Sequence, residues 1–491
     1  MIYYTIRAVR IKRRKEPSGA RGNIRGRNNA HGKIIRAMKR QLPRLVFLAA
    51  ALLAAGAADA QIFFGLPPAV RFGVKKLRAS PAAPGAPGLP PVSGEKDWSV
   101  QLGTTTTDNG YRAVTDAAGN VYVAGVTDGG LDGNASAGGD DVFLVKYNSA
   151  GARQWTRQFG TALNDQASGV TVDASGDVYV AGNAAAGLDG NPSAGGLDMF
   201  LVKYSAAGAK QWTRQLGTAS DEHSSGVAAD VSSNVYVAVY TLGGLDGNTN
   251  AGGQDLFLVK YNSSGAKQWT KQLGTAADDW SFGAASDPGG NIYVCGVTNG
   301  GLDGNTSAGG YDMFLVKYDT AGARQWTRQL GTGFTDWGSD VEADSSGNVY
   351  VTGYTVGGLD GNTNAGGLDI FLVKYDSAGV KKWTRQLGTP LDDSGAGVAA
   401  GAADDIFVTG YTQGGLDGNA SAGGLDMFLV KYNSSGSRQW TRQLGSGADD
   451  SGSGAVTDAA GYVYVTGKTD GAFDGNLSAG GQDMFLVKYA Q

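Results

Sequence analysis

A ten-residue segment rich in side-chain oxygens occurs seven times in the chain, and its residue types are suited to binding a cation. Its first copy is Asp132-Gly-Asn134-Ala-Ser136-Ala-Gly-Gly-Asp-Asp141, with oxygen-bearing side chains at positions 1, 3, 5 and 10. Alternating oxygen ligands around a glycine-rich turn suit Ca²⁺, which takes roughly six to eight of them. Asp, Asn, Ser and Gly also form turns through hydrogen bonds to their own backbone. Calcium binding and turn formation are therefore both open interpretations.

The first, third and tenth positions of each copy define the predicted calcium ligands. They supply two carboxylates and an amide oxygen in every copy. No other metal or cofactor is predicted, because the chain contains one cysteine and two histidines. The predicted Ca²⁺ ligands are Asp132, Asn134, Asp141, Asp189, Asn191, Asp198, Asp246, Asn248, Asp255, Asp303, Asn305, Asp312, Asp360, Asn362, Asp369, Asp417, Asn419, Asp426, Asp474, Asn476 and Asp483.

Two tryptophans interrupt an otherwise regular acidic pattern. Trp280 follows Asp279 and Trp337 follows Asp336, at positions where the other copies have smaller or polar residues, and Tyr311 lies between them in the chain. Trp and Tyr dominate binding hot spots, so these five residues form a predicted ligand face. Packing of the aromatic rings against one another is the alternative. The acidic series as a whole is Asp108, Asp165, Glu222, Asp279, Asp336, Asp393 and Asp450.

A 57-residue unit must position these side chains, because the motif FLVKY recurs at that spacing seven times. A fixed period of this kind indicates a repeat architecture. A tryptophan keeps the same spacing, so the units extend from about residue 95 to the end of the sequence. The phenylalanines of the motif are Phe143, Phe200, Phe257, Phe314, Phe371, Phe428 and Phe485.

Each unit contains four short candidate strands and no helical period. In the first unit they are Tyr111–Thr115, Val121–Gly125, Asp141–Tyr147 and Arg153–Phe159, separated by Gly-containing turns. Four antiparallel strands in each of seven units predict an all-β fold, a seven-bladed β-propeller.

The two ends of the repeat region are complementary. The region begins with a tryptophan strand at Trp98 and ends with the FLVKY strand at Phe485, so the last unit lacks its fourth strand. The N-terminal strand is therefore expected to complete the last blade and close the ring, which leaves no unpaired sheet edge. In such blades the loop before the first strand and the loop between the second and third strands emerge at the same end of the sheet. These loops contain the acidic series and the oxygen-rich segments, so we expect one acidic face there.

The units resemble the bacterial seven-bladed β-propeller repeat family, the SBBP repeat. The shared motif D-x-x-G-N-V-Y-V-x-G occurs as Asp344-Ser-Ser-Gly347-Asn348-Val-Tyr350-Val-Thr-Gly353, followed by F-L-x-K-Y and G-x-x-x-W. The resemblance covers about four-fifths of the chain. It implies a propeller fold and an extracellular or cell-envelope location, and it implies no particular reaction.

The first 60 residues differ sharply from the rest in charge. They contain 14 Lys and Arg against two Asp and Glu, whereas the remainder contains 27 against 43. A basic start at Met38, an apolar run over residues 45–57 and the sequence Ala58-Asp59-Ala60 are typical of a secretory signal peptide. The run is too short for a membrane-spanning helix. We predict a secreted, periplasmic or cell-surface bacterial protein, cleaved near Ala60.

The sequence thus divides into four regions. Seven of the twelve prolines lie within residues 61–95, which favours an extended linker there. The predicted regions are 1–37, a basic arm or a mis-assigned upstream start; 38–60, the signal peptide; 61–94, the Pro-rich linker; and 95–491, the propeller.

The function predicted from these features is a binding scaffold that recognises a protein or a glycan. A calcium-stabilised structural surface protein without a specific ligand is the alternative. A propeller hydrolase or lyase is disfavoured, because catalysis needs different groups converging on one point and the units are nearly identical. Excess acidic charge disfavours nucleic acid as a partner. We expect a monomer with no membrane-spanning segment in the mature chain.

Overall fold

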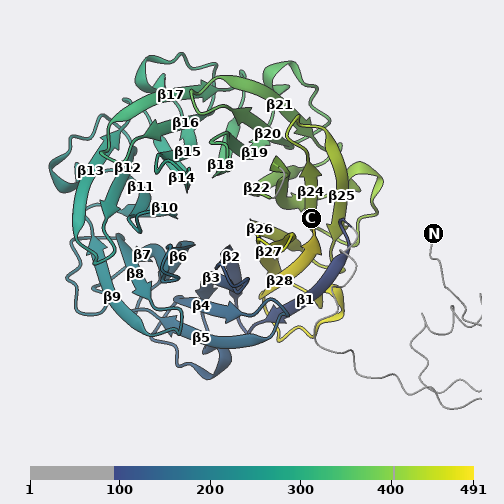
Figure 1. Cartoon of the computed structure of the whole chain (residues 1–491), viewed down its shortest axis with the longest axis horizontal. Helices are drawn as coiled ribbons and strands as arrows, with labels where there is room; N and C mark the ends of the chain where they lie inside the picture. Colours follow the sequence, from purple (N-terminus) through teal and green to yellow (C-terminus); the bar gives the residue numbers. More distant parts are fainter. Residues whose placement is uncertain (1–92, 402–403) are drawn as a thin grey trace, which may run out of the picture. The chain divides into compact units, whose positions relative to one another are not determined.

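The computed structural model describes residues 93–401 and 404–491, which belong to one compact unit, Gly88–Gln491. Seven four-stranded antiparallel sheets surround a central axis in this part of the chain (Figure 1). The prediction of an all-β seven-bladed propeller is confirmed. The predicted basic arm, signal peptide and nearly all of the linker lie outside the described residues.

Blade 1 shows the arrangement common to the blades. From the axis outwards its strands are β2 (Asp108–Thr115), β3 (Val121–Thr127), β4 (Asp141–Tyr147) and β5 (Arg153–Phe159), with a one-turn 3-10 helix, η1 (Leu131–Gly133), between β3 and β4. Blades 2 to 6 repeat this order as β6 (Asp165–Val172), β7 (Val178–Ala184), β8 (Asp198–Tyr204), β9 (Lys210–Leu216); β10 (Glu222–Ala229), β11 (Val235–Thr241), β12 (Asp255–Tyr261), β13 (Lys267–Leu273); β14 (Asp279–Ser286), β15 (Ile292–Thr298), β16 (Asp312–Tyr318), β17 (Arg324–Leu330); β18 (Asp336–Ala343), β19 (Val349–Thr355), β20 (Asp369–Tyr375), β21 (Lys381–Leu387); and β22 (Asp393–Ala400), β23 (Ile406–Thr412), β24 (Asp426–Tyr432), β25 (Arg438–Leu444).

Blade 7 joins the two ends of the propeller. It contains β26 (Asp450–Thr457), β27 (Tyr462–Thr469) and β28 (Asp483–Ala490), and its outermost strand is β1 (Lys96–Leu102) from the start of the propeller. The β1 strand pairs antiparallel with β28. The expected ring closure by the N-terminal tryptophan strand is therefore confirmed.

Apolar side chains between neighbouring blades form the core. Tyr122 and Leu144 of blade 1 pack in one cluster with Val180 and Phe200 of blade 2, and all four are fully buried. Because the two middle strands of a blade have neighbours on both faces, they are continuously apolar instead of alternating. Removal of this surface from water is the main stabilising contribution.

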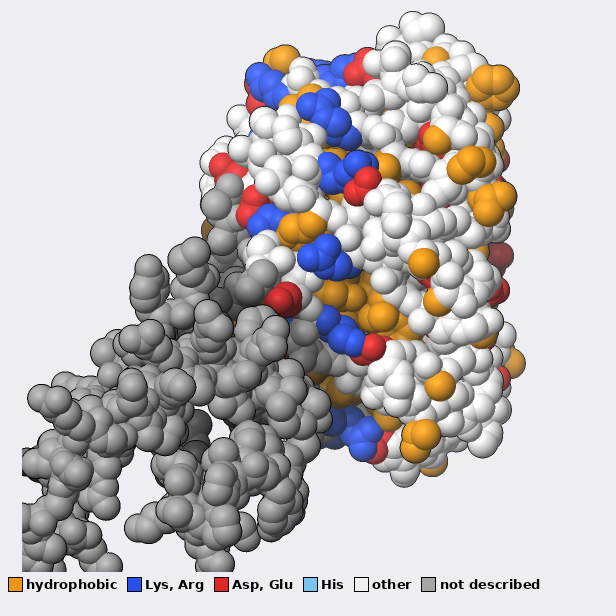
Figure 2. All heavy atoms as spheres, turned by 90° about the vertical axis from the view of Figure 1, so that its right-hand side faces the viewer, with side chains coloured by type: hydrophobic (Ala, Val, Ile, Leu, Met, Phe, Trp, Pro, Cys, Tyr) orange, Lys and Arg blue, Asp and Glu red, His pale blue; other side chains and the backbone are white. Residues whose placement is uncertain are grey.

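The outer strands also join each blade to the next. The turn glycine Gly151 of blade 1, at φ +79°, lies against Trp98 of blade 7, and a Cβ at this glycine would be 3.0 Å from the ring. Trp98 Nε1 donates to Ser149 O at 3.3 Å. Similarly, Arg157 Nε of blade 1 donates to Gly208 O of blade 2 at 2.7 Å. Figure 2 shows Lys and Arg side chains along the outer wall, several of them beside an acidic side chain.

The D-x-x-G-N-V-Y motif is explained by the turn between the two inner strands. The Asp116 carboxylate accepts hydrogen bonds from the backbone N–H groups of Ala118 and Asn120 at 3.0 and 2.9 Å, and from the Tyr122 hydroxyl at 3.0 Å. One side chain therefore closes the turn and also satisfies a tyrosine whose ring is in the core.

Candidate functional site

The first two predicted calcium ligands of blade 1 make hydrogen bonds within their own blade. The Asp132 carboxylate accepts a hydrogen bond from Thr156 Oγ1 at 2.7 Å and forms an ion pair with Arg153, both from β5. Asn134 Nδ2 donates to Leu131 O at 2.8 Å, which fixes the amide against the 3-10 turn. These contacts are the turn chemistry that the sequence left open beside calcium binding.

The same ion pair occurs in every blade. It joins the first residue of the oxygen-rich segment to the first residue of the outer strand. Burial would raise the pKa of Asp189, but hydrogen bonds from Lys210 and Thr213 hold it below its ordinary value. The aspartates that begin the oxygen-rich segments are therefore neutralised locally by basic side chains of the outer strands. The pairs are Asp132–Arg153, Asp189–Lys210, Asp246–Lys267, Asp303–Arg324, Asp360–Lys381, Asp417–Arg438 and Asp474–Lys96.

The third predicted ligand is directed elsewhere. Asp141 is fully buried at the start of β4, where it accepts hydrogen bonds from Ala137 N at 2.7 Å and Gln158 Nε2 at 2.8 Å. Across the blade interface it lies near Asp165, whose pKa is raised by burial and also by the charge of Asp141. Within residues 93–401 and 404–491, no three or more His, Cys, Asp or Glu side chains are grouped to hold a metal. Calcium binding stays a prediction.

The second acidic series is also buried. All seven of its members have no solvent exposure, including Asp279 and Asp336 of the predicted ligand face. The expectation that this series contributes to an exposed acidic face is therefore wrong. The sequence shows the charge of these residues but not that they begin the innermost strands, where loop N–H groups and Thr hydroxyls solvate them, as Thr332 and Thr355 do for Asp336.

The three predicted aromatic residues lie together at one end of the propeller. The rings of Trp280 and Tyr311 stack with centroids 5.2 Å apart, and Trp337 lies 5.7 Å from Trp280 and 6.0 Å from Tyr311. Trp280 and Trp337 are the second residues of β14 and β18, and Tyr311 ends the loop before β16. All three side chains are partly exposed. At this end of the propeller, the loop of the oxygen-rich segment meets the start of the next blade's innermost strand. Asp336 N donates to Tyr311 O at 2.7 Å there.

Four further aromatic residues extend this group. Tyr354 stacks on Trp337 at 5.9 Å, Phe282 lies 4.8 Å from Trp337, and Tyr240 lies 6.1 Å from Trp280 and stacks on His223 at 4.8 Å. Sequence reasoning missed them, although strand pairing could have found two, because Tyr354 is opposite Trp337 and Tyr240 is opposite His223. The aromatic cluster comprises His223, Tyr240, Trp280, Phe282, Tyr311, Trp337 and Tyr354.

Five of the seven cluster residues occupy a ring of positions at which the blades differ. The second residue of each innermost strand and its partner on the next strand change from blade to blade, whereas FLVKY is constant. Blades 3 to 6 each have an aromatic residue here, and blades 7, 1 and 2 have mainly polar ones. We call these pairs the variable rim: Asn109/Val126, Gln166/Asn183, His223/Tyr240, Trp280/Val297, Trp337/Tyr354, Ser394/Tyr411 and Ser451/Lys468.

The central channel contains a cavity of about 340 Å³ lined by all seven innermost strands. Its wall consists mainly of Gly, Ala, Val, Ser and Thr. The fifth residue of the innermost strand is glycine in five blades. A Cβ at Gly226 would come within 2.8 Å of the next blade's backbone, which explains the preference. The exceptions are Arg112 in blade 1 and Asp340 in blade 5.

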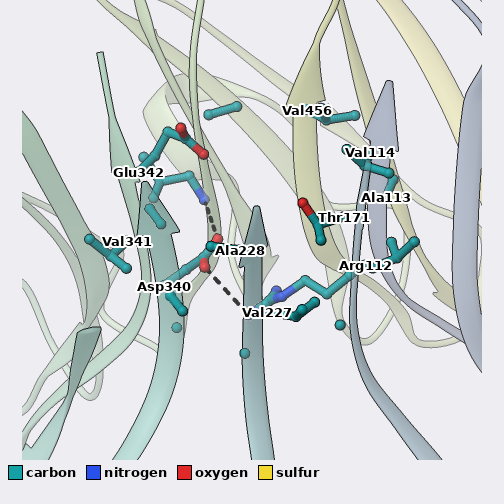
Figure 3. Close-up of a pocket in the computed structure, with 18 of the residues that line it drawn as sticks. Arg112, Ala113, Val114, Thr171, Val227, Ala228, Asp340, Val341, Glu342 and Val456 are labelled. Carbon is teal, nitrogen blue, oxygen red and sulfur yellow. Dashed lines mark hydrogen bonds and ion pairs between the residues drawn. The ribbon is translucent and has the colours of Figure 1, made fainter. Parts of the chain in front are cut away.

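These two residues meet across the channel (Figure 3). Arg112 Nη2 lies 3.7 Å from Asp340 Oδ1, and Arg112 Nη1 donates to Ala396 O at 3.2 Å. Asp340 Oδ2 accepts a hydrogen bond from Val398 N at 3.0 Å. Glu342 lies two residues further along β18, and burial together with the nearby Asp340 charge raises its pKa to about 8.

No helix in the described residues is long and apolar enough to cross a membrane.

Comparison with known proteins gives two curated relatives. The chain is 26% identical over 384 residues to "Regulatory protein FlaEY" of Caulobacter vibrioides, covering 68% of this chain and 40% of that protein. It is 22% identical over 468 residues to "Uncharacterized WD repeat-containing protein L264" of Acanthamoeba polyphaga mimivirus, covering 70% and 34%. The chain therefore spans about a third to two fifths of the length of these relatives.

Solved structures give lower identity over most of the propeller. The Pan2 WD40 domain of Neurospora crassa is 11% identical with a TM-score of 0.44, covering 79% of this chain and 89% of that chain. The polysaccharide lyase Uly1 is 10% identical with a TM-score of 0.45, covering 81% and 100%.

One repeat family matches the chain directly. The SBBP family, described as "Beta-propeller repeat", matches residues 154–189, 268–303, 325–360, 382–417 and 439–474. Each match begins in an outer strand and ends at the Asp that opens the oxygen-rich segment of the next blade. The chain therefore contains five matched SBBP β-propeller repeats within a closed ring of seven blades.

Proposed function

We propose that this protein is a binding scaffold that recognises a protein or a glycan through the aromatic side of the variable rim. The observation that supports the proposal is that the rim pairs contain an aromatic residue in blades 3 to 6 and are mainly polar in blades 7, 1 and 2. Fold stability alone would be served by seven similar rims, as it is by seven similar FLVKY strands. A specific ligand, in contrast, needs different side chains in different blades.

The chemistry of the aromatic side suits recognition. Large rigid rings provide contact area at low cost in conformational entropy. Trp280 Nε1 is buried beside the stacked rings and has no hydrogen-bond partner among the described residues. Phe334 and Leu391, in the loops before the innermost strands of blades 5 and 6, are 61% and 50% exposed.

A loop substitution with a matched control tests the proposal. Phe334 and Leu163 occupy the same position of the loop before the innermost strand, in blades 5 and 2, and both are exposed, at 61% and 53%. Glycan-array and peptide-array binding should fall in Phe334→Ala and in Trp337→Ala and be unchanged in Leu163→Ala. Equal binding by all three variants, or no binding by the wild type on either array, would contradict recognition through this surface.

We further propose that the protein acts outside the cytoplasm, as the predicted signal peptide over residues 38–60 indicates. Expression in a bacterium followed by N-terminal sequencing of the protein in the periplasm or medium should give a chain that begins near Gln61. Retention of the full chain in the cytoplasm would contradict this location without affecting the recognition proposal.

A further inference from the structure

We propose that the central channel binds one small cation, with the Glu342 carboxylate as its counter-ion. This site is separate from the variable rim and does not depend on the proposed function.

The charges on the channel wall leave one carboxylate without a basic partner. The residues lining the cavity include three charged groups, Arg112, Asp340 and Glu342. Arg112 and Asp340 form the ion pair across the channel, and each makes further hydrogen bonds to backbone groups. The hydrogen bond that the structure gives to the Glu342 carboxylate comes from its neighbour Ala343 N at 3.2 Å. Figure 3 shows Glu342 on the cavity wall above Asp340.

The surroundings of Glu342 favour binding of a positive charge. At the same strand position, the other six blades place Val114, Thr171, Ala228, Ala285, Ala399 and Val456, none of which is ionisable. An ionised carboxylate is costly in such surroundings unless it is paired. The charged groups that face it from the strands around the cavity are Asp340 and Arg112, and Arg112 is engaged by Asp340. A proton or a bound cation neutralises the remaining charge, in agreement with the raised pKa of Glu342.

The channel cavity has a neighbouring cavity at its end opposite the variable rim. A second cavity of about 450 Å³ shares Ala229 and Ser286 with the first, and is lined by the turn aspartates of five blades. Lys146, Lys203 and Lys317 lie 3.9–4.0 Å from three of these carboxylates. The aspartates that line this second cavity are Asp116, Asp173, Asp230, Asp287 and Asp344.

The number of cations bound per chain distinguishes this site from sites in the oxygen-rich loops. Loop sites would occur in seven copies because the segment occurs in every blade, whereas Glu342 occurs once. Isothermal titration of the full chain with CaCl₂, and separately with methylammonium chloride, should give one equivalent per chain for at least one of them. The two probes distinguish a metal ion from an organic ammonium ion.

The pH dependence provides a second readout. With a Glu342 pKa of about 8, the group is largely protonated at pH 7 and ionised at pH 9, so binding should be about tenfold tighter at pH 9. At pH 7, titrations in buffers of different ionisation enthalpy should reveal release of about one proton per bound cation. Equal affinity at both pH values, or no heat with either probe, would overturn the proposal.

Two variants complete the test. Glu342→Gln keeps the side-chain size and should abolish binding, whereas Asp303→Asn, which removes a loop carboxylate, should leave it unchanged. Binding of several equivalents that falls in Asp303→Asn and persists in Glu342→Gln would place the cations in the loops and overturn the proposal. If Glu342→Gln does not fold, a carboxyl ¹³C titration of the wild type decides, because bound cation must lower the apparent pKa of Glu342.

Discussion

The Arg112 guanidinium lies 3.7 Å from the Asp340 carboxylate, and this ion pair joins blades 1 and 5 across the channel. The two residues are 228 positions apart in the chain and replace the glycine that the other five blades have at this position. Both substitutions occur together in one molecule, and each supplies the partner that the other requires. The ring therefore has a specific cross-channel connection in addition to its symmetric blade contacts.

We expect the two residues to be energetically coupled. Arg112→Gly and Asp340→Gly should each lower stability, because each leaves the opposite charge in the channel without its partner. The double variant restores the glycine of the other blades and should recover about 1–3 kcal/mol relative to the sum of the single losses. Urea unfolding of the four proteins measures this coupling. Strictly additive losses would show that the pair does not interact.

Glu342 should make stability depend on pH. Its folded-state pKa of about 8 lies above the ordinary 4.5, so the folded protein binds the proton more tightly than the unfolded chain does. This stabilising contribution is complete below pH 4.5 and is lost as the pH rises through 8. The melting midpoint of the wild type should therefore decrease relative to Glu342→Gln between pH 5 and 9. A constant difference between the two proteins over this range would contradict the prediction.

The tryptophans of the outer strands should be important for the contact between blades. Trp326 Nε1 donates to Ser377 O of the next blade at 3.3 Å, and its ring lies against the turn glycine Gly379. Trp326→Ala should cost about 3 kcal/mol, the lower end of the range for large aromatic residues because the side chain is partly exposed. Phe334→Ala, at an exposed loop residue, should cost less than about 0.5 kcal/mol. Similar losses in the two variants would show that the outer tryptophan does not stabilise the interface.

The outer arginines should contribute through hydrogen bonds as well as charge. Arg328 Nε donates to Gly379 O at 2.6 Å, and Nη2 donates to Ala378 O at 3.3 Å. Arg328→Ala should therefore cost about 1.5–3 kcal/mol, as expected for hydrogen bonds from a charged group. Arg328→Lys should cost less, because Lys271 occupies the equivalent position of blade 3. Thermal unfolding of both variants gives the comparison, and equal losses would contradict it.

The sequence predicted the architecture closely because the period and the turn residues are local signals. The predicted strands Asp141–Tyr147 and Arg153–Phe159 have the bounds found in the structure, and the missing fourth strand of the last unit predicted the closure. The candidate sites were harder to predict. Asp132 and Asp141 are nine residues apart, yet one faces an outer strand and the other a blade interface.

One feature depended on the closed ring and another on the register between two strands. The Arg112–Asp340 pair requires the radius of seven closed blades, which no local pattern specifies. The stacking of Tyr354 on Trp337 requires the register between β18 and β19, which a bulge between Gly338 and Asp340 shifts by one residue. Charge and aromatic content could therefore be predicted from the residues, while their partners required the three-dimensional arrangement.

Pairing of β1 with β28 also determines when the protein can finish folding. A ribosome produces β1 before any other described propeller strand and β28 after all the others, so the seventh sheet must wait until β28 has been synthesised. Six sheets can assemble in order as the chain grows, while β1 stays without its neighbour and has an open edge. A chain truncated before residue 483 would keep that edge permanently and should aggregate or be degraded, even with six complete blades.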